Sequence, residues 1–393
     1  MKVARVFVMA SALLASGCWK RHEVALSNVH PSHWEVVPAQ EIGAGPLRSF
    51  TTWRAHLATI RDFVSRHGAL PISDSDPDWT KEMLEDTLAG LEALSTGDEG
   101  EFWRALGEHF YVLRLAPQEA AFFTGYYTME LPARLKPDAE FKIPIYGPPA
   151  DLVANGPTYN RVAIDRDGLL AGKGLEIAWL RDPLDAYFLH VQGSATLLLP
   201  RGEKLGVGVA NTNHMEYVSL GRLLVKEGRI SAADISLFSI RDFFKAHPEE
   251  LNNYIWRNPR YVFFQKSDGI PRGSLGAPVM AFHSAAVERY RGVMYRFPPL
   301  LPLILDLPEP KGQGRFSCLV FSQDTGSAIT GDNRFDLYTG VGSEAEKIAG
   351  VLKHQGSAMA LWPKSAGIPT WLAGLQVKSR PERPATSWFS NRR

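Results

Sequence analysis

Cysteine is almost absent from this sequence, which has only Cys18 and Cys318 among its 393 residues. Two cysteines exclude a disulfide framework, so the fold must be held together by an apolar core. Hydrophobic residues make up 45% of the chain, which is enough to build such a core. The length suggests two domains.

An excess of charge of one sign is also missing, because 43 basic and 42 acidic side chains give a formal net charge of +1. We therefore expect no polybasic surface and no nucleic acid partner. The sequence shows no internal repeat of 20 to 50 residues. Its histidines, such as His190, His214 and His283, are scattered, so we expect neither a metal site nor a cofactor.

Long apolar runs are missing too, and the stretch Val6–Leu14 is too short to span a bilayer. We predict that residues 1–18 are a lipoprotein signal peptide, because Ala15-Ser16-Gly17-Cys18 resembles a lipobox. This resemblance implies lipidation of Cys18, and two acyl chains suffice for stable anchoring. The residue after it is Trp19 and not aspartate, which implies an outer-membrane lipoprotein facing the periplasm. An ordinary signal peptide with an incidental cysteine is the alternative.

Residues 19–45 contain prolines and little periodicity, so we interpret them as a tether. Apolar residues then recur at intervals of three and four, which predicts three helices over residues 50–64, 79–91 and 102–110. Strands are predicted from Phe122 onward. The tail, residues 378–393, is basic, contains two prolines and is expected to be disordered.

The rest of the chain mixes both kinds of element. Ala186–Gln192 and Thr196–Leu199 are rich in apolar residues and are predicted to be strands. A late helix is predicted to begin at Ser343, because Ser343 and Glu346 have the spacing of a capping box.

Residues 321–342 carry the most information about chemistry. Asp324 and Asp336 stand among four glycines, which permit sharp turns and a close approach of ligand to backbone. Asp336 lies in an apolar–polar alternation that predicts a strand. Flanking Phe335 and Tyr338 can shield its carboxyl from water, which raises the pKa as a general acid requires. Aspartates near glycine also form ordinary turns, so a structural role is the alternative.

This segment resembles the C-terminal 3D module of the membrane-bound lytic murein transglycosylase A family. The positions that fit the pattern are Asp324, Gly326, Ala328, Ile329, Gly331, Phe335, Asp336, Tyr338, Gly340 and Gly342. Glu288 stands where the module has an earlier aspartate, and Tyr290–Leu305 matches poorly. Further motifs follow the order of the family over roughly residues 100–365: Phe123–Tyr127, Gly174–Trp179, Phe188–Ser194, Asn258–Phe264 and Gly273–Gly276.

The resemblance implies a mainly β fold with helices. Residues 46–132 together with residues 267–377 would form a catalytic double-psi β-barrel domain. Residues 133–266 would form a second, β-rich domain inserted into the first, with a deep groove between the two. Clefts between domains are common ligand sites, and a long groove suits a polymer.

The substrate implied by the resemblance is the glycan strand of peptidoglycan, cut at the β-1,4 bond between N-acetylmuramic acid and N-acetylglucosamine. The implied enzyme is a lytic exotransglycosylase, a polysaccharide lyase of cell-wall turnover and remodelling. In this reaction the C6 hydroxyl of the sugar attacks C1 and closes a 1,6-anhydro ring. Because the attacking group is part of the substrate, one carboxyl can first donate and then accept a proton. Its position in the motif assigns this role to Asp336.

Asp324 is predicted to support catalysis, chiefly by holding loop amides or by aiding a sugar hydroxyl. The other side chains expected to contact glycan lie in the same motifs: Thr124, Tyr126, Tyr127, Gln192, Gly193, Ser194, Ala328 and Tyr338. A turn at the end of a strand is the alternative for Gln192–Ser194. The expected partners are peptidoglycan glycan strands and outer-membrane lipid, and other cell-wall enzymes are candidates.

Two other functions stay open at this point. Asp324-Thr325-Gly326-Ser327 matches the tetrad of aspartic proteases, but those enzymes need two such aspartates and this chain has one Asp-Thr-Gly. A glycan-binding envelope lipoprotein without catalysis is the third reading, against which the intact surroundings of Asp336 argue. Digestion of purified cell-wall sacculi separates the three.

Overall fold

The computed structural model describes residues 34–39, 42, 46–67, 79–115, 120–152, 158–232, 234–290, 294–295, 298–309, 314–326, 329, 331 and 333–367. The predicted signal peptide with Cys18, most of the tether, the basic tail and Ala328 lie outside these residues. Each helix within them is too short or too polar to cross a membrane.

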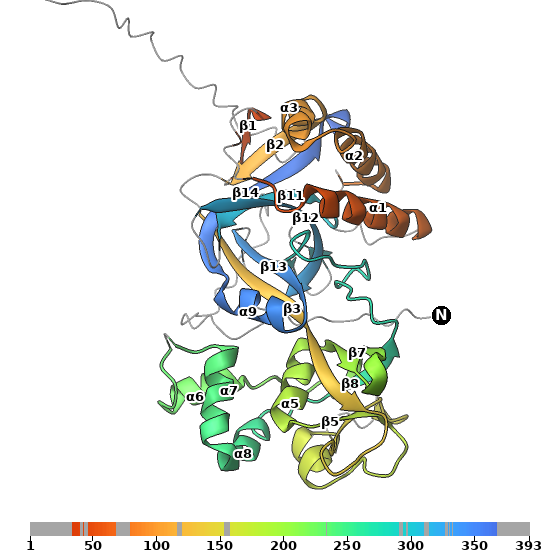
Figure 1. The fold of residues 1–393 in the computed structure, drawn as a ribbon, viewed down its shortest axis with the longest axis vertical. Helices are drawn as coiled ribbons and strands as arrows, with labels where there is room; N and C mark the ends of the chain where they lie inside the picture. Colours follow the sequence, from red (N-terminus) through yellow and green to blue (C-terminus); the bar gives the residue numbers. More distant parts are fainter. Residues whose placement is uncertain are drawn as a thin grey trace, which may run out of the picture.

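Six strands form a closed ring in the middle of the molecule (Figure 1). In ring order they are β14 (Lys353–Pro363), β11 (Pro302–Pro308), β12 (Arg315–Gly326), β9 (Ser284–Tyr290), β13 (Arg334–Val341) and β3 (Ala121–Arg134), and β3 pairs again with β14. β12 is parallel to β9 and β13 is parallel to β3, whereas the other four pairs are antiparallel. The sheet continues from β14 to β2 (Phe110–Leu115) and β1 (Trp34–Val37), and β10 (Met294–Tyr295) pairs with β9.

Helices cover two sides of this ring, and together they make what we call the ring lobe. α1 (Phe50–Arg66), α2 (Lys81–Leu94) and α3 (Glu99–His109) lie at its top in Figure 1, which confirms the three predicted helices. Their apolar stripes pack into one core with β2 and the six strands of the ring. α9 (Gly342–Val351) covers β3, so closely that a side chain at Gly125 would come within 2.7 Å of the Cα atom of Ala349.

The second lobe, which we call the insert lobe, is built from residues 135–270. Its strands are β4 (Ile143–Tyr146), β5 (Glu176–Leu180), β6 (Ser194–Leu198), β7 (Lys204–Thr212) and β8 (Val262–Ser267), and its helices are α5 (Pro183–Gln192), α6 (Leu220–Lys226), α7 (Leu237–Ala246) and α8 (Leu251–Ile255). A π-helical turn spans Val162–Arg166, and 3-10 turns span Pro200–Gly202, Pro248–Glu250 and, in the ring lobe, Lys364–Ala366. The insert lobe has a largely separate apolar core.

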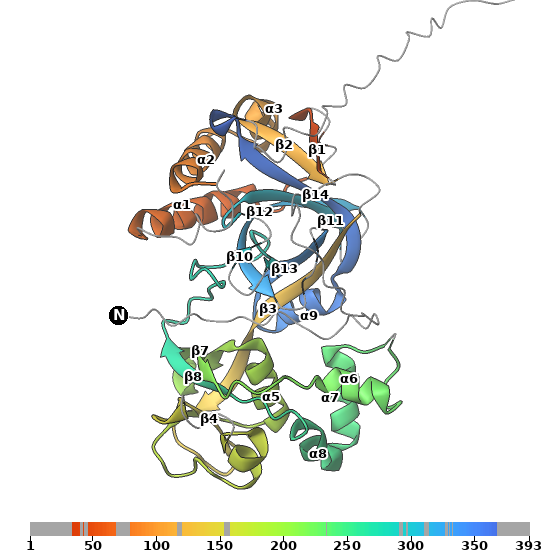
Figure 2. The same ribbon diagram turned by 180° about the vertical axis from the view of Figure 1, so that it is seen from behind.

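Strand β3 belongs to both lobes. Its first part, Phe122–Tyr126, pairs with β13 in the ring. Farther along, Met129–Pro132 pairs with β6 and Ala133–Arg134 pairs with β5 in the insert lobe. The sheet therefore runs from one lobe into the other, as Figure 2 shows from behind.

The described residues form a mixed helix and sheet fold, and two local predictions are wrong. Ala186–Gln192 is helix α5 and not a strand. Nearly all of its side chains are buried, so apolar content could not separate the two alternatives. Asp182, whose side chain caps the helix, and Pro183 at its first position were the signals of a helix start. α9 begins with Val341 as its N-cap, without a side-chain cap, so the capping box predicted at Ser343 does not form.

Candidate active site

Asp324 and Asp336 lie on the two strands that flank β9. Asp324 of β12 and Asp336 of β13 are both in register with Ala286 of β9. Side chains at matching positions of paired strands share a face of the sheet, and only the methyl group of Ala286 stands between the aspartates in this row. Thr124 of β3 continues the row beyond Asp336. The structure therefore brings the two predicted acids together on one face of the ring.

Asp336 is buried, and its Oδ1 atom has no hydrogen-bond partner among the described residues. Phe335, which was expected to shield it, is buried in the core on the other face of the sheet, whereas Tyr338 lies on the same face. Burial raises the pKa of Asp336 to about 6, and the positive charge of Arg334 opposes part of this rise. Near neutral pH, a carboxyl with this pKa is protonated in a much larger fraction of molecules than an ordinary aspartate, which suits a general acid.

Arg334 is the residue that the sequence analysis missed. Its Nη2 atom donates to Thr124 Oγ1 at 2.7 Å and lies 3.9 Å from Asp336 Oδ1. Its Nη1 atom donates to the carbonyl oxygens of Phe335 (3.2 Å) and Phe122 (3.5 Å), and the guanidinium lies 4.8 Å from the centre of the Phe122 ring. The available signal was its position two residues before Asp336 in a predicted strand, because such residues point to one face.

Asp324 is equally buried, but backbone amides hold its carboxyl group. Its Oδ1 atom accepts hydrogen bonds from the N–H groups of Ser274 (2.9 Å) and Thr325 (2.8 Å). Gly273 permits this approach, because a Cβ atom there would lie 2.2 Å from the carbonyl oxygen of Gln323. Burial raises the pKa of Asp324 to about 7, although the hydrogen bonds lower it. The Gly273–Gly276 motif thus packs directly on this aspartate.

Two tyrosines line the same face one step farther along the strands. Tyr126 and Tyr338 are register partners with ring centres 5.1 Å apart, and the Tyr338 hydroxyl hydrogen-bonds the Thr128 hydroxyl at 2.8 Å. The Tyr126 hydroxyl is buried, and its contact with Asp324 falls outside hydrogen-bond geometry. Burial and, next, the charge of Asp324 raise the pKa of Tyr126, so this hydroxyl stays protonated.

Tyr127 does not join this face. It points to the opposite side of β3, where its hydroxyl donates to Glu346 Oε1 of α9 at 2.7 Å. Gln192 is buried at the end of α5, and Gly193 follows in the left-handed region with a φ of 83°. Of the predicted glycan contacts, Tyr127 therefore lies on the opposite side of β3 from the two aspartates.

Ser194 lines an open pocket of about 100 Å³ where the insert lobe joins the ring lobe. Most of its exposed lining is apolar, with Ala195, Val207, Ile270 and Pro271, and polar groups come from Thr128, Ser194, Thr196, Gln265, Ser267 and Arg272. Thr128 is the link to the other side chains, because it also contacts the Tyr338 hydroxyl.

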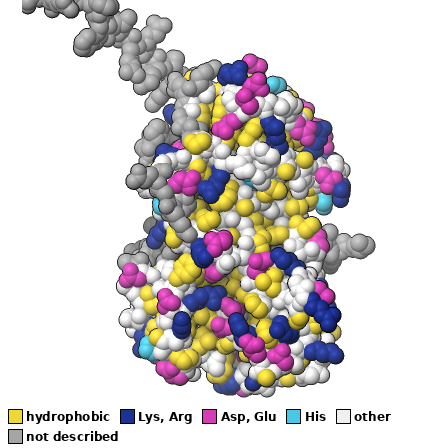
Figure 3. All heavy atoms as spheres, in the orientation of Figure 1, with side chains coloured by type: hydrophobic (Ala, Val, Ile, Leu, Met, Phe, Trp, Pro, Cys, Tyr) yellow, Lys and Arg dark blue, Asp and Glu magenta, His cyan; other side chains and the backbone are white. Residues whose placement is uncertain are grey.

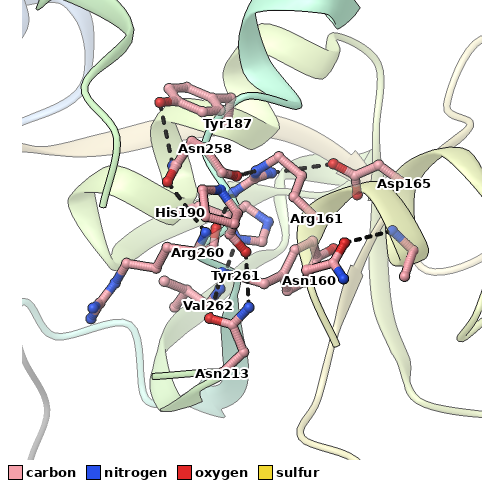
Figure 4. A network of polar contacts seen from close by, with 12 residues as sticks. Asn160, Arg161, Asp165, Tyr187, His190, Asn213, Asn258, Arg260, Tyr261 and Val262 are labelled. Atoms are coloured by element: carbon pink, nitrogen blue, oxygen red, sulfur yellow. Dashed lines mark hydrogen bonds and ion pairs between the residues drawn. The ribbon is translucent and has the colours of Figure 1, made fainter. Parts of the chain in front are cut away.

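The Asn258–Phe264 motif encloses a different polar cluster, which Figure 4 shows. Arg161 is buried at its centre and donates to three oxygens: Asn258 O (3.2 Å), Arg260 O (3.0 Å) and Asp165 Oδ2 (3.2 Å). The guanidinium also lies 5.1 Å from the ring centres of both Tyr187 and Tyr261. This cluster ties the segment before β8 to the rest of the insert lobe.

The side chains around Arg161 are satisfied in the same way. Asn213 donates to the carbonyl oxygens of Tyr159 and Pro259, both at 2.9 Å, and accepts from the N–H of Tyr261 at 3.0 Å. His190 Nδ1 accepts from the N–H of Val262 at 3.1 Å, and burial lowers the pKa of His190, which keeps it neutral. These hydrogen bonds tie the cluster together and stabilise the insert lobe.

The charges on the outside agree with the composition. On the face shown in Figure 3, basic and acidic side chains are intermingled over both lobes and do not gather by sign. Among the described residues, one group could offer ligand atoms to a metal ion, namely His247, Glu249 and Glu250 on the insert lobe. Because Glu250 also pairs with Arg229, this surface group has an ordinary ionic role.

Comparison with known proteins now bears on this arrangement. Residues 122–265 match the family model of the MltA specific insert domain, and residues 298–362 match that of the 3D domain. The resemblance to the membrane-bound lytic murein transglycosylase A family is confirmed. The two matched segments contain β3 with Thr124 and Tyr126, and β12 and β13 with Asp324 and Asp336.

Curated relatives support this family along the sequence. The membrane-bound lytic murein transglycosylase A of Vibrio cholerae is 32% identical over 247 residues, which is 61% of this chain and 64% of the relative. The protein of the same name in Escherichia coli K12 is 31% identical, over 61% of this chain and 65% of its own. The matched region thus spans just under two thirds of these relatives.

Solved structures support the fold over a larger share of the chain. A membrane-bound lytic murein transglycosylase from Agrobacterium tumefaciens is 27% identical with a TM-score of 0.67, covering 85% of this chain and 98% of that structure. The lytic transglycosylase LtgG of Burkholderia pseudomallei is 25% identical with a TM-score of 0.56, covering 91% and 99%. The two-lobed arrangement is therefore shared with transglycosylases of this kind.

Proposed function

We propose that this chain is a lytic transglycosylase that cuts the β-1,4 bond between N-acetylmuramic acid and N-acetylglucosamine in peptidoglycan, leaving 1,6-anhydro ends. The observation that carries the proposal is the Asp336 carboxyl, which is buried on a strand with one oxygen unpartnered. It sits in a segment that matches the 3D domain, in a chain that also matches the MltA specific insert domain, and similar proteins are named membrane-bound lytic murein transglycosylase A.

In the proposed reaction, one carboxyl acts twice. The protonated Asp336 donates to the glycosidic oxygen as the bond from C1 to this oxygen breaks. The resulting carboxylate then removes the proton of the C6 hydroxyl as its oxygen bonds to C1, which regenerates the acid. Water is not consumed, and the attacking hydroxyl is held next to C1 by the sugar itself. No metal or cofactor is needed for these steps.

The surrounding residues take supporting roles in this proposal. Asp324 holds the Ser274 amide and so shapes the wall of the site, while Tyr126, Tyr338 and Thr124 contact the sugar beside Asp336. Ser194 lines the pocket where the lobes join, and we assign it, with the preceding Gly193, to binding of the glycan farther along the strand. Ala328 is assigned a place in the same wall by its motif alone.

We also retain the finer domain assignment as a proposal. The six-stranded ring is taken to be a double-psi β-barrel, formed by residues 46–132 and 267–377, with residues 133–266 as the insert. The closed strand pairing and the separate core of the insert lobe support this division. Residues 19–45 would be a tether and residues 378–393 a disordered tail.

The proposed location is the outer membrane, with the catalytic lobes facing the periplasm and Cys18 acylated. The relatives are named membrane-bound, which supports attachment of some kind. Changing Cys18 to alanine should abolish labelling with palmitate and release active protein into the soluble fraction. If the variant still incorporates palmitate, the lipobox interpretation is wrong.

An aspartic protease is less well supported, because the Asp324 carboxyl is engaged by the amides of Ser274 and Thr325. The deciding experiment is mass spectrometry of the products from purified sacculi. We expect muropeptides with 1,6-anhydro ends, lighter by one water than hydrolysis products. Reducing ends alone would make the protein a hydrolase, and bound but undigested sacculi would make it a binding protein.

A further inference from the structure

Arg334 lies beside the proposed acid in an unusual way. Its Nη2 atom is 3.9 Å from Asp336 Oδ1, which is beyond hydrogen-bond distance. The same nitrogen donates to Thr124 Oγ1 at 2.7 Å, and Nη1 donates to the carbonyl oxygens of Phe335 and Phe122. We infer that Arg334 is a positioning residue, held off Asp336 by Thr124 so that the carboxyl stays an acid until it gives up its proton.

The inference rests on the proposed function, and the geometry gives its reason. A guanidinium in direct contact would form a strong charge-assisted pair and lock Asp336 in the ionised form. Four contacts that do not involve Asp336, including the Phe122 ring at 4.8 Å, keep the guanidinium in place. The attraction across 3.9 Å still favours the carboxylate, because the site is shielded from water.

The role of Arg334 changes during the reaction. In the first step the proton of Asp336 moves to the glycosidic oxygen, the C1–oxygen bond breaks and a carboxylate remains beside the guanidinium. In the second step the C6 oxygen bonds to C1 and its proton returns to that carboxylate. The fixed positive charge stabilises the carboxylate between the two steps and takes up no proton itself, since an arginine stays charged.

Few other ionisable groups of the described residues face Asp336. Tyr126 approaches from β3, Asp324 stands across β9, and Tyr338 follows on the same strand. Lys353, the register partner of Thr124 on β14, is exposed to solvent. Arg334 is the positive charge that pairs with Asp336, and it lowers the pKa that burial raises.

The test compares Arg334→Met, Arg334→Lys and Thr124→Val by the dependence of kcat/KM on pH, with purified sacculi as substrate. In the wild type, the rate should fall as pH rises through the pKa of Asp336. We call this fall the alkaline limb of the pH profile. Arg334→Met should move the alkaline limb to higher pH by about one unit and lower kcat on the order of tenfold or more. Arg334→Lys keeps the charge, so its limb should stay near that of the wild type with a partly reduced rate.

Thr124→Val should shift the limb of the pH profile in the opposite direction. Without the Thr124 hydroxyl, Nη2 is free to reach Asp336, so the limb should move to lower pH. A folded Arg334→Met variant with an unmoved limb would overturn the inference. If that variant does not fold, an unmoved limb in Thr124→Val overturns it instead. The proposed function fails separately, if the wild type releases no 1,6-anhydro products.

Discussion

Two arginine–aspartate pairs among the described residues are opposite in character. In the insert lobe, the Arg161 side chain is 2% exposed and Asp165 is 28% exposed, and the pair closes at 3.2 Å. In the ring lobe, Asp336 is the more deeply buried partner, with 3% exposure against 19% for Arg334, and the gap is 3.9 Å. The arginine is the more buried partner in the first pair, and the aspartate is the more buried partner in the second.

The hydrogen bonds differ in the same sense. Arg161 gives its remaining donors to the carbonyl oxygens of Asn258 and Arg260, so the buried charge is satisfied (Figure 4). Asp336 keeps an oxygen without a partner. A buried polar atom without a hydrogen-bond partner lowers the free energy of unfolding by about 1–3 kcal/mol, and by more if the group is charged. We attribute this cost at Asp336 to the proposed proton transfer, whereas the Arg161 pair serves stability.

The largest expected effect comes from removing the unsatisfied acid. Asp336→Asn keeps the shape of the side chain but cannot exchange the proton. The rate of sacculi digestion should therefore fall by about a hundred- to ten-thousand-fold or more, since this is the usual contribution of one acid–base group. Asp324→Asn is the matched control, with a smaller loss because its carboxyl holds amides. Turnover assays with circular dichroism as a check of folding decide this. A dead, folded Asp324→Asn beside an active Asp336→Asn would reverse the assignment.

The next prediction compares the two arginines by stability. Arg161→Met leaves carbonyl oxygens and Asp165 without their donor, so we expect a loss of about 3–5 kcal/mol in the free energy of unfolding. Arg334→Met also removes a donor from Thr124 and from the carbonyl oxygens of Phe122 and Phe335, but it breaks no hydrogen bond to Asp336. Because the Arg334 side chain is 19% exposed against 2% for Arg161, water can replace part of what is lost, and we expect a smaller loss. Urea unfolding at pH 7 measures both. Equal losses would mean that the ring-lobe pair is structural after all.

A smaller effect should appear in the dependence of stability on pH. Burial raises the pKa of Asp336 to about 6 in the folded state. The resulting contribution to the free energy of unfolding is fully present below the pKa of the unfolded chain, and it is lost as pH rises through 6. Asp336→Asn should therefore match the wild type near pH 4 and be more stable at pH 8, by up to about 3 kcal/mol for a shift of two pKa units. Thermal melts at both pH values test this. No difference at pH 8 would show that Asp336 is not effectively buried.

The smallest predicted effect concerns Gly273, whose loop packs on the buried carboxyl of Asp324. A methyl group there would collide with the Gln323 carbonyl, so Gly273→Ala should cost roughly 1–3 kcal/mol and weaken the Ser274 contact. Gly276→Ala is an instructive neighbour, because Gly276 has open space around it but a φ of 84°. Urea unfolding of both variants, with sacculi digestion alongside, separates collision from backbone strain.

Sequence reasoning reached the two aspartates because glycine spacing and strand alternation are local patterns. It missed Arg334, although that side chain is two residues away, because nothing in the pattern says which cation lies within reach. It also placed Tyr127 beside Tyr126, whereas adjacent residues of a strand point to opposite faces. Long-range contacts such as that of Ser274 with Asp324 depend on the returning chain and leave no periodic signal.

The fold shows the same limit. The three helices before β2 were predictable because each has a solvent-facing side that breaks the apolar pattern into a stripe. α5 is buried on nearly every side, so its apolar run looked like a strand. The closure of the ring could not be read from any segment, since it depends on pairing between strands far apart in the chain.

That distance has a consequence for how the protein is made. β3 pairs with β13, and Arg334 meets the Phe122 carbonyl across 212 positions of the chain. Joining such remote strands is slow, because the entropy of closing the intervening loop must be lost before the contacts are gained. A folded insert lobe shortens this loop by holding its two ends together on β3 and β8. We therefore expect a newly synthesised chain to complete the aspartate face last, and core substitutions in the insert lobe to delay the gain of activity without touching either acid.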